Sequence, residues 1–155
     1  MTYTLFSWNV NGIRAAQRKG LFDWLLREQP DVLAMQETKC DASQLPGALT
    51  AVPGYRSFWA SAQRKGYSGV GVYSRIEPVS TIVGLGEPRW DDEGRVIVVE
   101  YEHFLLYNVY FPNGKSGPQR LDYKMAFYDR FLEVMTRRRQ EPKPVVICGD
   151  VNTAN

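Results

Sequence analysis

The sequence has 155 residues, of which 44% are hydrophobic, and its formal net charge is +2 at pH 7. This length suits one domain, and the composition is far from that of disordered chains. No apolar run approaches the length of a membrane span, and no basic-then-apolar leader opens the chain, so we expect a cytoplasmic protein without a membrane partner. The net charge is too small to argue for nucleic acid by itself.

The first part of the chain predicts a strand, a helix and a second strand. Residues 3–10 carry apolar and aromatic side chains on both faces, which predicts a strand covered on both sides. Apolar residues recur at helical spacing over 21–25, Pro30 ends that helix, and 32–36 is the next apolar strand. Strand, helix and strand in this order favour a parallel pair joined by a crossover.

The rest of the chain predicts short strands and one long helix, so the fold class is α/β. The expected strands are 55–60, 70–73, 79–83, a hairpin of 95–101 with 104–110, and 145–148, which should run parallel to 104–110. Residues 118–140 should form a helix, with Ser116 and Gln119 resembling a capping box before it. Its predicted apolar stripe consists of Leu121, Met125, Tyr128, Leu132 and Met135.

Four of these strands are apolar in their body and polar where they end. The polar residues are Asn9 and Asn11, Gln36 and Glu37, Tyr110 and Asn113, and Asp150 and Asn152. If crossovers make the strands parallel, the four tips lie on one edge of the sheet. At any single position turn formation is the commoner role of Asn, Asp and Gly, but four tips decorated alike weaken that explanation.

The expected cluster contains carboxylates, amides and a phenol, and no histidine or thiolate. Oxygen-rich ligand sets suit hard cations, and Mg²⁺ is commonly held by one or two carboxylates together with water and substrate phosphate. The thiolate and imidazole ligands that zinc prefers are absent from this set. The residues therefore favour metal-assisted attack of water on a phosphate ester.

Five segments, in order along the chain, resemble the motifs of the exonuclease III family of apurinic/apyrimidinic endonucleases, within the endonuclease/exonuclease/phosphatase superfamily. They are SWNVNGIRA (7–15), PDVLAMQETK (30–39), GYSGVGVYSR (66–75), NVYFPNG (108–114) and CGDVNTAN (148–155). The resemblance implies a four-layer αββα sandwich like that of DNase I, with residues 1–155 as the amino-terminal part of a single domain. It also implies a Mg²⁺-dependent DNA-repair hydrolase that incises 5′ to abasic sites, with 3′→5′ exonuclease and 3′-end cleaning activity. Its partner would be double-stranded DNA with abasic sites or 3′ ends.

The resemblance also implies roles for residues of the expected cluster. Glu37 matches the principal Mg²⁺ ligand, with Mn²⁺ as a substitute, and Asn9 matches an amide that helps to order the metal. Tyr110 matches a tyrosine that contacts the scissile phosphate. Asp150 matches the acid that orients or deprotonates the attacking water, and Asn152 the amide that positions phosphate and water.

By the same resemblance, a further set of residues is expected to bind substrate: Asn11, Arg14, Lys65, Tyr67 and Asn113. At Asn11 relatives carry Asp or Asn, which leaves direct metal ligation open. The loops with Arg14 and Lys65 would border the DNA backbone, where phosphate contacts position a duplex without reading its sequence. For Tyr67, packing is an equally good interpretation.

The family pattern includes a second half that ends in Ser-Asp-His, and this half is not matched here. The single histidine, His103, falls at the predicted hairpin turn, at the opposite end of its strand from Tyr110. We therefore expect the chain alone to be inactive as a nuclease and to need the carboxy-terminal half of the same fold as a partner. Two other functions stay open: an enzyme acting on lipid or inositol phosphates, and a non-catalytic fragment that binds DNA or a partner.

Overall fold

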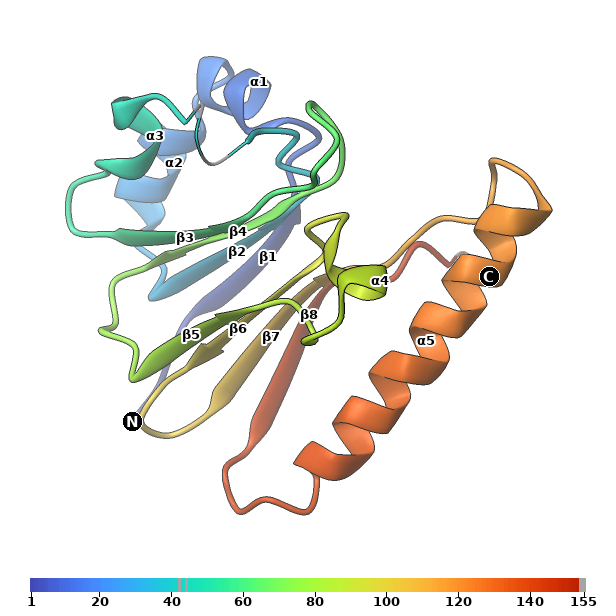
Figure 1. Ribbon diagram of the computed structural model, residues 1–155. Coiled ribbons are helices and arrows are strands. Elements are labelled where there is room, and N and C mark those ends of the chain that lie inside the picture. The colour runs from blue at the N-terminus through green and yellow to red at the C-terminus, as the bar shows by residue number, and fades with distance from the viewer. Residues whose placement is uncertain (42, 44, 154–155) are drawn as a thin grey trace.

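The computed structural model, which describes residues 1–41, 43 and 45–153, contains two sheets that pack face to face between outer helices (Figure 1). The first sheet has the order β1-β2-β4-β3, and the second β5-β6-β7-β8. The strands are β1 (Leu5–Asn9), β2 (Val32–Gln36), β3 (Arg56–Ala60), β4 (Val70–Ser74), β5 (Ser80–Val83), β6 (Val96–Glu100), β7 (Leu105–Tyr110) and β8 (Val145–Asp150). The helices are α1 (Ile13–Arg18), α2 (Leu21–Glu28), α3 (Gly47–Thr50), α4 (Pro88–Asp91) and α5 (Pro118–Arg138).

Three buried layers hold the four-layer αββα arrangement together. Leu25 of α2 and Leu33 of β2 belong to the layer between the first sheet and its helices. Val72 and Leu106 belong to the layer between the sheets, and Phe127 of α5 to the layer outside the second sheet. Helices α1 to α3 cover one outer face and α5 the other, as Figure 1 shows. The predicted α/β sandwich is confirmed.

The predicted strand pairings are confirmed as well. Strand β1 runs parallel to β2, β7 runs parallel to β8, and β6 and β7 form the expected antiparallel hairpin. Both parallel pairs are joined by a helical crossover, which contains α2 in the first sheet and α5 in the second. Each pair therefore ends its two strands at the same edge, which is the requirement for gathering their polar tips. Within the described ranges, no helix is long and apolar enough to cross a membrane.

Strand β1 departs from the prediction, because none of its residues is fully buried and neither of its faces is completely covered. It is the edge strand of the first sheet, and Phe6 and Trp8 are 40% and 41% exposed. Both rings contact Trp24 of α2 edge-on, yet α2 leaves them partly open. The apolar composition of β1 indicated a strand correctly, but composition does not distinguish an edge strand from a central one.

Helix α5 shows two further departures. Its N-cap is Gly117 with no side-chain hydrogen bond, so the predicted capping box of Ser116 and Gln119 does not form. The residues it buries are Phe127, Phe131 and Met135, whereas Leu121, Met125 and Leu132 are between 49% and 66% exposed. The predicted stripe was wrong at Leu121, Met125 and Leu132, because aromatic side chains spaced four apart take the sheet-facing side, and right at Met135, which is buried. Helix α1 was not predicted.

Candidate active site

The polar ends of β1, β2, β7 and β8 meet at one end of the sandwich. Asn9 Nδ2 donates a hydrogen bond to Asp150 Oδ2 at 2.8 Å. The hydroxyl of Tyr110 donates to Glu37 Oε1 at 2.5 Å. Each bond joins a tip of the first sheet to a tip of the second, so the four side chains form one cluster across the two sheets. The predicted convergence is therefore present in the structure.

Backbone contacts from two loops hold Glu37 in place. Its φ of 55° lies in the left-handed region, which is costly for a residue other than glycine. The Gly12 N–H donates to the Glu37 carbonyl at 2.7 Å, and the Thr38 N–H donates to the Gly69 carbonyl at 3.1 Å. A Cβ at Gly69 would lie 2.4 Å from Thr38 Oγ1, so only glycine permits this approach. The surrounding structure thus determines where the Glu37 carboxylate points.

The Glu37 carboxylate has a cation on one oxygen and a phenol on the other. Lys39 Nζ lies 3.3 Å from Glu37 Oε2 and donates to Asn11 Oδ1 at 2.7 Å. Burial, followed by the hydrogen bond to Glu37 and its charge, raises the pKa of Tyr110 far above its ordinary value. Tyr110 is therefore a protonated hydrogen-bond donor at neutral pH.

Asp150 is fixed by contacts on both of its oxygens. Besides the bond from Asn9, its Oδ1 accepts the backbone N–H of Asn152 at 2.9 Å. Asn152 in turn donates from Nδ2 to the Phe111 carbonyl at 2.7 Å. Lys124 of α5 donates to the Asn152 carbonyl at 2.7 Å. The carboxylate of Asp150, at the end of β8, and the amide of Asn152, two residues further on, are therefore fixed relative to each other.

The expected substrate-binding residues lie around this cluster rather than within it. Arg14 is exposed on α1, and Lys65 is exposed in the loop before β4. Asn113 is exposed, and its Oδ1 accepts the backbone N–H of Lys115 at 3.3 Å. Tyr67 is half-buried, and its hydroxyl makes hydrogen bonds within the protein. Asn11 reaches the cluster through its backbone N–H, which donates to Asn9 Oδ1 at 3.0 Å, and through Lys39.

His103 lies in the turn between β6 and β7, as predicted, while Tyr110 is the last residue of β7. Its side chain is 50% exposed, and its Nε2 lies 3.8 Å from Glu102 Oε2. It is therefore at the opposite end of the strand from the cluster.

Sequence reasoning missed a buried amide beneath the site. Asn108 is fully buried; its Oδ1 accepts a bond from Gln36 Nε2 at 2.8 Å, and its Nδ2 donates to the carbonyls of Met35 and Gly71 at 3.1 and 3.0 Å. Asn108 of the second sheet thus bonds to β2 and β4 of the first. The signal was available, because a single amide interrupts the otherwise apolar run of β7. Arg95 and Lys39 were missed as well.

The donor set of the cluster fits a hard divalent cation. Glu37, Asp150 and Asn9 offer carboxylate and amide oxygens within one cluster. In the described part of the chain, no three His, Cys, Asp or Glu side chains lie close enough to hold a metal by themselves. A cation here would rely on one or two carboxylates with water and substrate phosphate, which is the usual arrangement for Mg²⁺.

Comparison with known proteins agrees with this geometry. The family model described as the Endonuclease/Exonuclease/phosphatase family matches residues 6–155. The chain belongs to this family. Among its relatives, "DNA repair nuclease APEX1" of Danio rerio is 41% identical over 96% of the chain and 48% of its own length. "Exodeoxyribonuclease" of Bacillus subtilis is 41% identical over 97% of the chain and 59% of its own length. The chain thus spans about half the length of these curated relatives.

Solved structures give the same placement within the Endonuclease/Exonuclease/phosphatase family. An AP endonuclease from Archaeoglobus fulgidus superposes with a TM-score of 0.86 at 29% identity, covering 99% of the chain and 58% of the relative. The 3′ phosphatase NExo from Neisseria, bound to a product DNA hairpin, superposes with a TM-score of 0.86 at 27% identity, covering 99% and 59%. The resemblance to AP endonucleases and exodeoxyribonucleases is confirmed, and the fold is theirs over this part of the domain.

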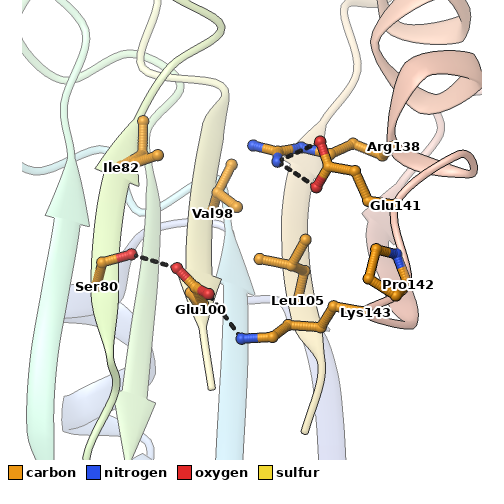
Figure 2. Close-up of a pocket in the computed structure, with 9 residues that line it drawn as sticks. All are labelled: Ser80, Ile82, Val98, Glu100, Leu105, Arg138, Glu141, Pro142 and Lys143. Atoms are coloured by element: carbon orange, nitrogen blue, oxygen red, sulfur yellow. Dashed lines mark hydrogen bonds and ion pairs between the residues drawn. The ribbon is translucent and has the colours of Figure 1, made fainter. Parts of the chain in front are cut away.

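A pocket lies at the far end of the second sheet, away from the strand tips (Figure 2). Its strand residues include Glu100, the last residue of β6, and Leu105, the first residue of β7. Its charged groups pair with one another: Lys143 Nζ lies 2.6 Å from Glu100, and Arg138 Nη1 lies 2.9 Å from Glu141. This pocket does not belong to the candidate active site.

Proposed function

We propose that the site belongs to a Mg²⁺-dependent DNA-repair phosphodiesterase that incises the backbone 5′ to abasic sites, with 3′→5′ exonuclease and 3′-end cleaning activity. The observation that carries the proposal is the pair of bonds that joins the strand tips, Asn9 to Asp150 and Tyr110 to Glu37. The relatives named as DNA repair nuclease, exodeoxyribonuclease and AP endonuclease support the DNA branch over lipid or inositol phosphates.

In this proposal Glu37 is the metal ligand, Asn9 orders its neighbourhood, and Mn²⁺ substitutes for Mg²⁺. The bound cation offsets negative charge that develops at the phosphate and the leaving oxygen. Asp150 accepts the proton of the attacking water, and the bonds from Asn9 and Asn152 to its two oxygens hold the carboxylate in one orientation. Asn152 donates to the phosphate oxygens, and Tyr110 turns its single proton from Glu37 to the phosphate when Glu37 binds the cation.

DNA contacts supplement this chemistry. Arg14, Lys65, Tyr67 and Asn113 lie on the surface around the strand tips or in the loops that lead to them, and the first two are cationic. Exposed cations suit the phosphate backbone, which is the dominant source of affinity for duplex DNA. We assign the backbone flanking the scissile phosphate to these residues, together with Asn11 at the edge of the cluster.

We further propose that incision requires a second protein segment seated against the open edge of the sandwich. Strands β1 and β8 are both edge strands, and Phe6, Trp8 and Ile147 expose between 40% and 49% of their surface there. Open edges with apolar side chains are normally covered in native proteins. The relatives, about twice as long, contain additional sequence that could supply the cover.

The test is incision of an abasic-site duplex in the presence of Mg²⁺. The purified chain is assayed alone and with the portion of the Bacillus subtilis relative that it does not match. We expect incision only in the mixture, abolished by Glu37→Gln and unchanged by the control Glu141→Gln, which removes a paired carboxylate at the far end of the sheet.

The other outcomes separate the alternatives. Incision by the chain alone would disprove the need for a second segment but keep the function. Hydrolysis of inositol phosphates faster than DNA incision would overturn the DNA assignment. DNA binding without incision in either format would favour the non-catalytic fragment.

A further inference from the structure

Arg95, which directly precedes β6, is a buried cation that the proposed chemistry does not use. Only 2% of its side chain is exposed. Its Nε donates to Glu93 Oε2 at 2.7 Å, its Nη1 to the carbonyl of Tyr110 at 3.0 Å, and its Nη2 to the hydroxyl of Tyr67 at 3.0 Å. One guanidinium therefore contacts both the phenol residue of the cluster and a residue assigned to the DNA-facing surface.

The contacts between Arg95 and Tyr110 fix the tyrosine along its whole length. The Tyr110 N–H donates to the Arg95 carbonyl at 2.8 Å, and the guanidinium carbon lies 4.9 Å from the centre of the Tyr110 ring. The phenol oxygen at the other end of the ring bonds to Glu37. Backbone, ring face and hydroxyl are each held, so the direction of the phenol depends on Arg95 as well as on Glu37.

Glu93 supplies the negative charge that makes this burial tolerable. It contacts Arg95 and also Arg120 of α5, whose Nη1 and Nη2 lie 2.8 and 3.1 Å from its two oxygens. Burial alone would raise the pKa of Glu93, but the hydrogen bonds and charges of Arg120 and Arg95 outweigh it and lower that pKa below its ordinary value. Arg120 Nη2 also donates to the Tyr67 hydroxyl at 3.3 Å, which closes the network.

The backbone between Glu93 and Arg95 is locked in place. Gly94 has a φ of 59°, and a Cβ there would lie 2.5 Å from the carbonyl carbon of Ser61 and 2.7 Å from the nitrogen of Ala62. The segment 93–95 therefore lies directly against the chain that follows β3. Only glycine allows that approach, so the guanidinium and its carboxylate enter the interior from a rigid support.

We propose that Arg95 is a positioning residue that holds Tyr110 in its active orientation and ties it to Tyr67, so that the DNA-facing loop and the phenol form one rigid unit. This inference rests on the proposed function for the meaning of "active". The tie itself is a property of the folded chain. Its geometry predicts that loss of Arg95 disturbs Tyr110 more than loss of any exposed arginine does.

The test follows the ring of Tyr110 by ¹³C-tyrosine NMR of the chain, with its signal assigned from Tyr110→Phe. In Arg95→Met the signal should shift and broaden, and in Arg95→Lys it should return most of the way to the parent position. Because Arg95→Met leaves Glu93 short of a partner, the double variant Glu93→Gln with Arg95→Met is measured as well and should show the same disturbance. The matched control is Arg138→Met, which removes an arginine from the Tyr107 hydroxyl at the far end of β7 and should move Tyr107 alone.

A Tyr110 signal unchanged in the folded double variant would overturn the proposal, as would an equal disturbance by Arg138→Met. In the incision-competent mixture, Arg95→Met should lower kcat by about 10- to 100-fold with a much smaller change in KM. A displacement of about 1 Å in a group that acts on the substrate can slow a reaction by about 100-fold. If the Tyr110 signal responds while Glu37→Gln has no effect on incision, the proposed function fails and the tie stands.

Discussion

Two tyrosines of β7, Tyr107 and Tyr110, each contact an arginine that pairs with a glutamate, yet only the arginine beside Tyr110 is fully buried. At the site end Arg95 is 2% exposed and bonds to Tyr67, Tyr110 and Glu93. At the far end, drawn in Figure 2, Arg138 is 29% exposed and pairs with Glu141, which is 47% exposed. Tyr107, to which Arg138 donates at 2.8 Å, faces α5, whereas Tyr110 faces the layer between the sheets.

We infer that burial, and not residue type, distinguishes the Arg95 network, which we propose positions Tyr110, from the Arg138 network. An exposed pair is screened by water and contributes little, about 0–1 kcal/mol. A buried pair costs desolvation to form, but removing one partner leaves an uncompensated charge and costs about 3–5 kcal/mol. We therefore expect the exposed pair at the far end to contribute little, whereas the proposed positioning of Tyr110 depends on the buried Arg95.

Removal of the arginine should separate the two ends most clearly. Arg95→Met should lower the free energy of unfolding by about 3 kcal/mol, because the Tyr110 carbonyl and Glu93 lose a buried charged donor, although Arg120 still pairs with Glu93. Arg138→Met should lower it by less than about 1 kcal/mol, because its pair with Glu141 is partly exposed. Urea unfolding followed by circular dichroism measures both values. Equal losses would show that burial does not distinguish the two networks.

Removal of the phenol oxygen should separate the ends in activity. Tyr110→Phe loses a hydrogen bond to a charged group, worth about 1.5–3 kcal/mol, and should slow incision by about 10- to 100-fold. Tyr107→Phe loses the bond from Arg138 and should leave the rate at the parent value. Single-turnover incision of an abasic duplex in the competent mixture provides the comparison. Slow incision by Tyr107→Phe, or incision at the parent rate by Tyr110→Phe, would contradict the proposed role of the Tyr110 hydroxyl.

The smallest expected effect is on acid stability. Because the folded-state pKa of Glu93 is lowered, its ionised form contributes stability that is present above about pH 4.5 and is lost as the pH falls through the folded value. Glu93→Gln should therefore be less stable than the parent at neutral pH and approach it in acid. Glu141→Gln is the control, and its curve should follow the parent's. Melting temperatures between pH 3 and 7 test this, and a constant gap for Glu93→Gln would refute it.

Much of the fold was predictable because strand patterns here are strong and crossovers constrain topology. Strand β2 is apolar up to its last residue, Gln36, and was predicted with its observed bounds, and its parallel pairing with β1 follows from the intervening helix. The tip residues Asn9, Glu37, Tyr110 and Asp150 could be grouped for the same reason, since parallel neighbours end together. Their catalytic and metal-binding roles stay predictions.

The errors about α5 and Arg95 have a common physical cause. Which side chains become buried depends on contacts between distant segments, and a local sequence pattern does not contain these contacts. Along α5, Leu132 and Phe131 are neighbours in sequence, and both fit a helical stripe. Only packing against the second sheet decides that Phe131 is buried and Leu132 is 66% exposed. Arg95 was overlooked for the complementary reason: an arginine before an apolar strand resembles a solvated strand end until Glu93 and Tyr67 are brought to it by the fold.

Binding of Mn²⁺ to the chain, followed by electron paramagnetic resonance, tests the proposed metal site most directly, because the measurement does not depend on turnover. We expect one Mn²⁺ site whose affinity falls by at least about 10-fold in Glu37→Gln, because a charged oxygen ligand is lost, and is unchanged in Glu141→Gln. Equal Mn²⁺ affinity in the parent and in Glu37→Gln would contradict the assignment of the strand-tip cluster as a metal-dependent phosphodiesterase site.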